Sequence, residues 1–308
     1  MLIISVRGCG GSSVADFSGL VCMRLVTYNG GRVGYLDDDR VVDLDELVGG
    51  PGHSGAHSGM RRLLARWDEV RDALPAPTAG NSVALADVRL EAPVPDPTKI
   101  VAAPVNYRDH KSEMDMAVDI SDLAVFLKAP SSIIAHGGVV RLPYADRRVD
   151  QEGELAAVIG RRARDVDEDS ALEYVAGYTG LLDITMRGKE DRSTRKSFDT
   201  FTPLGPWLVT RDEAGPADDI ALDCTVGDDH RQSANTRHLI WGVAKLVSYI
   251  SSVMTLEVGD VIATGTPSGV GRLADGDEVS LTLSGIGTLS VTVAGGNPGL
   301  SPTGTRNR

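Results

Sequence analysis

Two glutamates separated by one residue, Glu152 and Glu154, precede the apolar segment LAAVIG. Side chains on a strand alternate between faces, so both carboxylates point the same way, with Cα atoms about 6.5–7 Å apart. On an exposed edge strand they would form only a solvated face, but the apolar residues that follow indicate burial. Two like charges in a partly buried sheet are unfavourable unless a cation neutralises them or a proton is retained. Carboxylate oxygens suit a hard divalent ion, so the pattern predicts Mg²⁺, with Mn²⁺ or Ca²⁺ as alternatives.

A third carboxylate belongs to Asp183, which lies between Leu182 and Ile184 at the end of an apolar run. An aspartate among such residues needs a partner when it is buried. We therefore predict that Glu152, Glu154 and Asp183 together bind one metal ion.

His110 and Glu113 have the spacing of neighbours on one helix face. A glutamate beside an imidazole raises its pKa and fixes its tautomer, so the pair could act as a general base. The alternative is an exposed histidine and glutamate that merely share a face. The remaining histidines have no comparable setting and are predicted to be structural or surface groups: His53, His57, His136, His230 and His238.

Several groups could hold a substrate carboxylate. The candidate cations are Lys128, Arg187, Arg192 and Lys196, while the charge-rich stretch Lys189, Glu190 and Asp191 is typical of a solvated loop. The glycine-rich segment 263–271 could contribute backbone amides at Gly265 and Thr266, or it could be only a tight turn that shapes a sheet. Nucleotide binding is excluded there, because no GK[ST] follows and the spacing is not GxGxxG.

The elements that would position these groups are mostly short strands. In residues 23–92 the pattern predicts a small β domain with one helix over 60–74, and the prolines at 93, 95 and 97 mark a boundary before a second domain, 99–293. Residues 1–22 lack a secretory pattern and are interpreted as a loosely attached extension, and 294–308 as a disordered tail. Strands are expected at 25–28, 33–36, 41–44, 100–102, 124–128, 139–142, 154–159, 178–184, 261–264, 279–283 and 289–293.

A short helix is expected after Asp167, and a longer one beginning at Asn235 or Thr236. Helices do not follow every strand, so the pattern favours an α+β fold with much sheet.

The composition excludes several classes of protein. The 308 residues carry a formal charge of −12, which repels nucleic acid, and no run approaches the roughly 20 apolar residues of a membrane-spanning helix. Cys9, Cys22 and Cys224 form neither a disulfide framework nor a metal motif, which favours a reducing cytoplasm.

Seven segments, in order, resemble the fumarylacetoacetate hydrolase family, bacterial type, which includes 2-hydroxyhepta-2,4-diene-1,7-dioate isomerase, acylpyruvase and fumarylpyruvate hydrolase. They are NYRDHKSE, FLKAPSS, EGELAAVIG, VAGYTGLLDIT, RKSFDTFTPLGPWLVT, MTLEVGDVIATGTPSGVG and GIGTL. The resemblance implies a sheet-rich, layered β-roll, usually dimeric. It also implies metal ligands at Glu152, Glu154 and Asp183, a His110–Glu113 lid dyad and an active-site lysine at Lys196.

The resemblance implies a divalent-metal hydrolase that cleaves a C–C bond in a small 2,4-dioxo acid of the acylpyruvate or fumarylacetoacetate type through a metal-stabilised enolate. The alternative within the family is an isomerase or decarboxylase of 2-hydroxydienoates or 2-oxo acids, as in aromatic-acid degradation. A third possibility is a binding module without catalysis. Leu182 and Gly188 depart from the family's commoner pattern, which has Asn and Asp there, and Ala103 stands where full-length fumarylacetoacetases have an aspartate.

Overall fold

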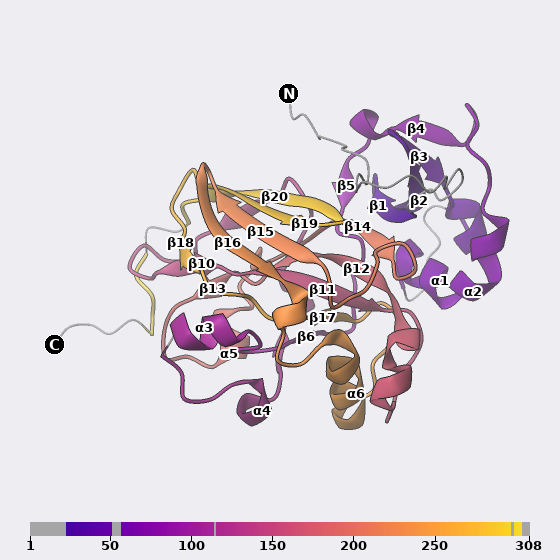
Figure 1. Ribbon diagram of the computed structural model, residues 1–308. Coiled ribbons are helices and arrows are strands. Elements are labelled where there is room, and N and C mark those ends of the chain that lie inside the picture. Colours follow the sequence, from indigo (N-terminus) through magenta and orange to yellow (C-terminus); the bar gives the residue numbers. More distant parts are fainter. Residues whose placement is uncertain (1–22, 51–56, 114, 297–298, 304–308) are drawn as a thin grey trace, which may run out of the picture.

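The computed structural model describes residues 23–50, 57–113, 115–296 and 299–303. The expected extension at 1–22, His53 and two of the three cysteines lie outside these residues. Most of the regular secondary structure is strand, and the strands form three sheets (Figure 1).

The largest sheet has 12 strands and spans both predicted domains. Its order is β4-β3-β2-β1-β14-β12-β11-β17-β6-β7, with β5 beside β1 and β8 beside β14. The strands are β1 (Arg24–Tyr28), β2 (Arg32–Asp37), β3 (Arg40–Asp43), β4 (Ser82–Ala84), β5 (Leu90–Glu91), β6 (Ile100–Ala102), β7 (Phe126–Lys128), β8 (Ile133–Ile134), β11 (Gly153–Ile159), β12 (Val175–Leu182), β14 (Thr202–Thr210) and β17 (Val261–Ala263).

The N-terminal strands continue the sheet of the larger part, because β1 pairs antiparallel with β14. The helix expected over 60–74 is divided into α1 (Gly59–Ala65) and α2 (Trp67–Val70). The break is at Arg66, whose φ of −116° departs from helical values. The apolar spacing continues across this break, which is why the sequence pattern indicated one helix.

A second sheet packs on the first and makes the fold a layered β-roll. Its order is β16-β15-β19-β20-β9, and in Figure 1 it lies over β11, β12 and β14. Its strands are β9 (Val139–Arg141), β15 (Ala221–Val226), β16 (Asp229–Asn235), β19 (Glu278–Leu283) and β20 (Gly287–Ala294). Apolar side chains of both layers form one core, in which Leu155, Leu222 and Leu281 are inaccessible to solvent.

Close packing between the layers requires glycine between the two glutamates. A Cβ at Gly153 would lie 2.9 Å from Leu281 Cδ1 and 3.3 Å from the Cβ of Cys224. Real Cβ atoms almost never come within 3.0 Å of such an atom, so Leu281 in the second layer would have to shift for a larger residue to separate Glu152 from Glu154.

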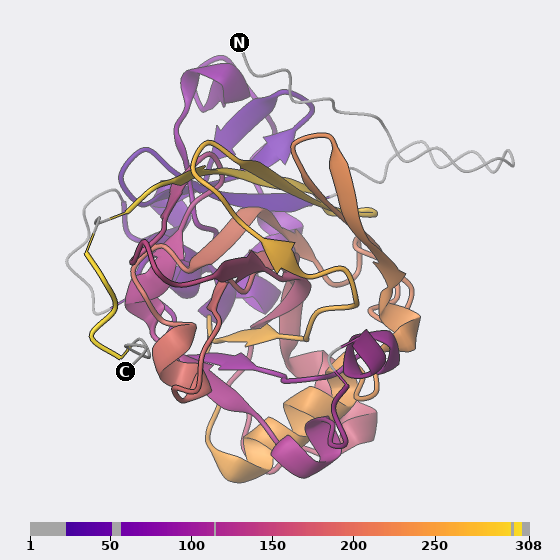
Figure 2. The ribbon, with the colours of Figure 1, turned by 90° about the vertical axis from the view of Figure 1, so that its left-hand side faces the viewer.

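A small third sheet and several short helices complete the fold. The sheet has the order β13-β10-β18, with β10 (Val149–Gln151), β13 (Thr185–Met186) and β18 (Gly271–Arg272). The helices are α3 (Arg108–Glu113), α4 (Ile120–Leu123), α5 (Arg192–Arg195) and α6 (Val243–Val253), and 3₁₀ turns cover Asp45–Val48, Arg71–Ala73, Leu85–Asp87, Pro130–Ser132, Glu168–Tyr174 and Thr236–His238. The left side of Figure 1, which faces the viewer in Figure 2, carries both α3 and α5.

Two sequence-based expectations about the C-terminal part need correction. The longer helix begins at Val243 rather than at Asn235 or Thr236, because strand β16 and a 3₁₀ turn occupy the residues before it. The predicted tail is ordered at 299–303, where the Ser301 amide donates to Asp146 Oδ1 and the Ser301 side chain meets Arg147. Among the described residues, no helix is both long and apolar enough to cross a membrane.

Candidate active site

The three predicted carboxylates meet where β11 begins beside the end of the antiparallel strand β12. Glu152, Glu154 and Asp183 each offer an oxygen within 4.8 Å of the others, and each residue is at most 5% exposed. Gly153 on β11 pairs with Leu182 on β12, and the Asp183 amide donates to the Glu152 carbonyl at 2.8 Å. Strand pairing therefore brings Asp183 to the glutamates from 29 residues away in the sequence.

Glu154 is the carboxylate with the fewest charged contacts. Its Oε2 accepts a hydrogen bond from the Gly265 amide at 2.7 Å, and within the described part of the chain it forms no ion pair. Burial and then the neighbouring Asp183 raise the pKa of Glu154 well above its usual range. The protein has thus buried a carboxylate that an additional cation would stabilise.

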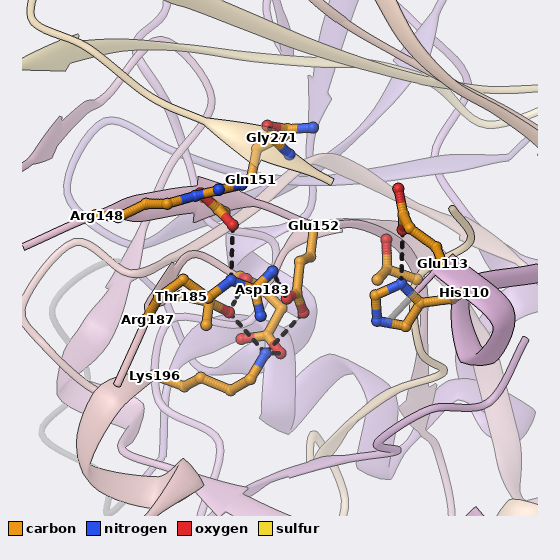
Figure 3. Close-up of polar contacts among 12 residues, drawn as sticks. His110, Glu113, Arg148, Gln151, Glu152, Asp183, Thr185, Arg187, Lys196 and Gly271 are labelled. Carbon is orange, nitrogen blue, oxygen red and sulfur yellow. Dashed lines mark hydrogen bonds and ion pairs between the residues drawn. The ribbon is translucent and has the colours of Figure 1, made fainter. Parts of the chain in front are cut away.

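Lys196 lies between the other two carboxylates (Figure 3). Its Nζ donates to Glu152 Oε2 at 2.7 Å, to Asp183 Oδ2 at 2.5 Å and to Thr185 Oγ1 at 2.7 Å. Burial alone would raise the pKa of Glu152, but Lys196, followed by Arg187 and His110, lowers it to about 2. Burial opposes the charge of Lys196, but Asp183 and Glu152 outweigh it and raise the lysine's pKa. The Glu152 carboxylate and the Lys196 ammonium group are therefore both charged.

The predicted dyad forms on α3 and is attached to the glycine-rich segment. His110 Nδ1 lies 3.2 Å from Glu113 Oε2, and Glu113 Oε1 accepts from the Gly269 amide at 2.9 Å. Ser268 also donates to Asp109 at 2.9 Å. Because Nδ1 faces Glu113, the other ring nitrogen is left for the pocket, which His110 lines (Figure 3).

One pocket joins the carboxylates, the dyad and a group of cations. Its cavity volume is about 120 Å³, and it is lined by His110, Glu152, Glu154, Asp183, Arg187, Arg192, Arg195, Lys196 and Thr266, together with the apolar side chains of Ala103, Pro104, Val105, Met116 and Phe126. A space of this size holds only a small ligand.

The predicted cations occupy different settings. Arg187 lines the pocket and pairs with Asp150 at 2.6 Å and Glu152 at 3.0 Å, and Arg192 lines it without an ion pair to any described residue. Lys128 does not line it: its Nζ is buried against Asp183 Oδ1 at 2.5 Å and the carbonyls of Lys196 and Phe201. Lys128 therefore acts on Asp183 from behind rather than on a ligand in the pocket.

In the glycine-rich segment, the two predicted ligand-binding groups, Gly265 and Thr266, form hydrogen bonds within the protein. The Gly265 amide donates to Glu154, and the Thr266 hydroxyl donates to the Gly153 carbonyl at 2.9 Å while accepting from Gln232 Nε2 at 2.7 Å. This segment orders the glutamate pair. The sequence offered no sign of Gln232, because it lies on a strand, β16, that was not predicted.

Sequence reasoning also missed Arg195. Its signal was the spacing Arg192-x-x-Arg195, which places both side chains on one face of a helical turn.

Glu190 departs from the expected solvated loop: Arg147 binds both of its oxygens at 2.8 Å. Lys189 and Asp191 are exposed as expected, and the described histidines other than His110 do not line the pocket.

The donor set fits a divalent metal ion. Three carboxylates converge, one of them without a charged partner among the described residues, and oxygen donors of this kind bind Mg²⁺, Mn²⁺ or Ca²⁺. Glu152, Glu154 and Asp183 are the residues that would hold the ion, with Lys196 sharing two of them.

Comparison with known proteins agrees with this arrangement. Residues 99–294 match the family model described as fumarylacetoacetate (FAA) hydrolase C-terminal. A maleylpyruvate hydrolase of Aquipseudomonas alcaligenes is 41% identical, covering 88% of this chain and 99% of the relative. The structure of maleylpyruvate hydrolase from Sphingobium sp. SYK-6 in complex with manganese(II) and pyruvate has a TM-score of 0.80 and 37% identity, covering 89% of this chain and 100% of that chain.

An isomerase is also similar. The structure of 2-hydroxyhepta-2,4-diene-1,7-dioate isomerase from Mycobacterium marinum has a TM-score of 0.70 and 31% identity, covering 89% of this chain and 98% of that chain. The similar proteins therefore include both a hydrolase and an isomerase.

Proposed function

Because the chain belongs to the fumarylacetoacetate hydrolase family, we propose that it is a divalent-metal-dependent hydrolase that cleaves a C–C bond in a small 2,4-dioxo acid. The observation that carries this proposal is one pocket in which three buried carboxylates and Lys196 face the His110–Glu113 dyad. The similarity to two maleylpyruvate hydrolases supports it.

Each group in the pocket has a distinct part in this reaction. A divalent cation, when bound, supplies the Lewis acidity that polarises the 2-oxo acid. His110, oriented by Glu113, accepts a proton from the water that attacks the distal carbonyl. Lys196 keeps its positive charge beside the carboxylates and favours the negative charge that develops on the departing 2-oxo fragment.

Mg²⁺ or Mn²⁺ is the proposed metal, and manganese is the ion in the similar structure with pyruvate. A homodimer remains a prediction from the family resemblance, and a cytoplasmic location remains one from the cysteine content. Isomerisation of a 2-hydroxydienoate is the second candidate, favoured by the similarity to the Mycobacterium marinum isomerase. The same pocket would serve this isomerisation, because isomerisation needs a proton shuttle but no attacking water.

The Glu113→Gln variant separates these functions. With Mn²⁺ or Mg²⁺, the wild-type protein should hydrolyse maleylpyruvate or another acylpyruvate, and the substitution should reduce kcat by at least about 10²-fold because the base loses its orienting carboxylate. Any decarboxylation of oxaloacetate in the same preparation should fall much less. Isomerisation of a 2-hydroxydienoate by a wild-type protein that hydrolyses no 2,4-dioxo acid would replace the hydrolase proposal with the isomerase.

A further inference from the structure

We propose that Gln151 is a positioning residue for the His110–Glu113 dyad and that it acts through the backbone of Gly269. The inference rests on the proposed hydrolase function, because it concerns the dyad that activates water in that reaction. It assigns a role to a buried side chain that does not line the pocket.

Gln151 is fully buried and directly precedes Glu152 in the chain. Its Nε2 donates to the Gly269 carbonyl at 3.0 Å, and its Oε1 accepts from the Gly271 amide at 3.1 Å. Figure 3 shows Gln151 beside Gly271. Two hydrogen bonds from one side chain therefore connect the residue before Glu152 to the glycine-rich segment.

Arg231 determines which way the Gln151 amide faces. Its Nη1 donates to Gln151 Oε1 at 2.9 Å and to the Arg272 carbonyl at 2.9 Å. The glutamine oxygen has two lone pairs, and the donors of Arg231 and Gly271 occupy both. The amide nitrogen, which only donates, therefore faces the Gly269 carbonyl.

The amide of the same glycine holds the dyad. The Gly269 amide donates to Glu113 Oε1 at 2.9 Å. The other oxygen of Glu113 lies 3.2 Å from His110 Nδ1. Three successive contacts therefore connect Gln151 to the imidazole.

Gly269 can transmit a displacement because its backbone is closely packed. Its φ is +96°, which favours glycine, and a Cβ there would lie 1.8 Å from the Arg231 carbonyl oxygen. The preceding Ser268 also donates to Asp109 of α3 at 2.9 Å. Since the carbonyl and the amide of Gly269 share one Cα, loss of the hydrogen bond at the carbonyl should loosen the amide that holds Glu113.

The metal ligands do not depend on the Gln151 amide. Glu152, the ligand next to it in the sequence, is held by Lys196 at 2.7 Å and by Arg187 at 3.0 Å. A change confined to the amide of Gln151 should therefore alter the dyad and leave the carboxylates in place.

Gln151→Glu tests this role with almost no change in shape. The new carboxylate can still accept from Arg231 and Gly271, but the donor to the Gly269 carbonyl becomes an acceptor, so that contact turns repulsive. With Mn²⁺ and maleylpyruvate, we expect kcat to fall by about 10- to 100-fold, while KM and the Kd for Mn²⁺ change by less than about threefold. If Gln151→Glu folds poorly, Gln151→Met, which keeps the side-chain length without the hydrogen bonds, should show the same separation of kcat from Kd.

Asn81→Asp is the matched control. Asn81 Nδ2 donates to the Ala76 carbonyl at 3.0 Å in a loop that does not line the pocket, so the substitution makes the same chemical change at the same hydrogen-bond length. It should leave kcat, KM and the Kd for Mn²⁺ unchanged. Equal losses of kcat and Mn²⁺ affinity in Gln151→Glu would show that Gln151 acts on Glu152 instead, and an unchanged kcat would also overturn the inference.

A double-mutant cycle checks that the effect passes through Glu113. If Gln151 acts by orienting Glu113, Gln151→Glu should change kcat by less than about twofold in a protein that already carries Glu113→Ala. Effects that multiply would show that Gln151 acts independently of the dyad and would contradict the inference.

Hydrogen exchange followed by mass spectrometry gives a readout that does not depend on turnover. In Mn²⁺-loaded protein, we expect Gln151→Glu to accelerate exchange in peptides covering residues 108–113 and 266–271 by at least about 10-fold and to leave β19 unchanged. If no 2,4-dioxo acid is cleaved, the hydrolase proposal fails, and this exchange pattern still decides whether Gln151 holds the dyad. Unchanged exchange in the two peptides would refute that role.

Discussion

Lys196 and Lys189 are only seven residues apart, but the fold gives them opposite environments. Lys196 is 4% exposed and contacts two carboxylates, whereas Lys189 is exposed on the preceding loop. Lys196→Ala should therefore lower kcat/KM by at least about 10²-fold, because a positive charge beside the developing anion is lost. Lys189→Ala should change it little. Steady-state kinetics on both variants checks this, and equal effects would contradict the role given to Lys196.

Lys128 shows how a residue can matter without touching the ligand. It is fully buried behind Asp183, and burial lowers its pKa while Asp183 opposes that effect. Its charge helps to hold Asp183 in the carboxylate group. The family resemblance alone did not distinguish this position from one in the pocket.

At the scale of elements, the Arg147–Glu190 pair joins three separate segments. Arg147 precedes β10, Glu190 precedes α5, and the Thr303 hydroxyl from the C-terminal segment donates to Glu190 at 2.5 Å. Arg147 also donates to the Arg187 carbonyl at 2.8 Å, so the pair supports the backbone of a pocket residue. Hydrogen bonds from Arg147, and then from Thr303, hold the pKa of Glu190 well below its usual range.

We expect Glu190→Gln to destabilise the protein at neutral pH by about 1–2 kcal/mol, because a charge-assisted hydrogen-bonded pair is lost. A carboxyl group with a depressed pKa stabilises the folded state above its ordinary pKa of 4.5 and loses this effect as the pH falls below it. The difference between variant and wild type should therefore be constant between pH 8 and pH 5.5. Urea unfolding measures it, with exposed Glu173→Gln as the control. A difference that already disappears at pH 6 would show that Glu190 is not held in this way.

At the scale of the whole molecule, the carboxylates link metal binding to stability. A ligand that binds only the native state stabilises it by about 2.7 kcal/mol at 100 times its Kd. Excess EDTA should therefore abolish turnover and lower the Tm by roughly 5 °C relative to Mn²⁺-loaded protein.

Glu154→Gln provides the matched variant for metal removal. Its amide oxygen can still accept from Gly265, but the repulsion from Asp183 and Glu152 is removed. Its Tm in EDTA should equal or exceed that of the wild type, and Mn²⁺ should raise it much less. Full activity of the wild type in EDTA, or an equal Mn²⁺ shift in both proteins, would contradict a metal site at these carboxylates.

The sequence by itself determined the type of fold and the chemistry of the carboxylate site. Short apolar runs with turn residues between them predicted most strands, and the Glu-x-Glu pattern indicated a same-face carboxylate pair. These features depend on local alternation, which acts between near neighbours in the chain. The strand β14 was missed because its two prolines and one glycine are unfavourable in a strand, and pairing with β1, β8 and β12 stabilises it there.

Only the tertiary structure decided which charges are free to meet a ligand. Lys128, Arg187, Arg192, Arg195 and Lys196 are all basic in the sequence, but their roles depend on which carboxylates the folded chain brings within about 3 Å of them. Asp150 and Glu152 neutralise Arg187, Asp183 neutralises Lys128, and Glu152 and Asp183 act on Arg195 without forming a direct ion pair with it. The Gly265 amide likewise donates a hydrogen bond to Glu154, which is 111 residues away in the sequence. Electrostatic interactions act through space, so their partners are determined by strand pairing and layer packing rather than by spacing along the chain.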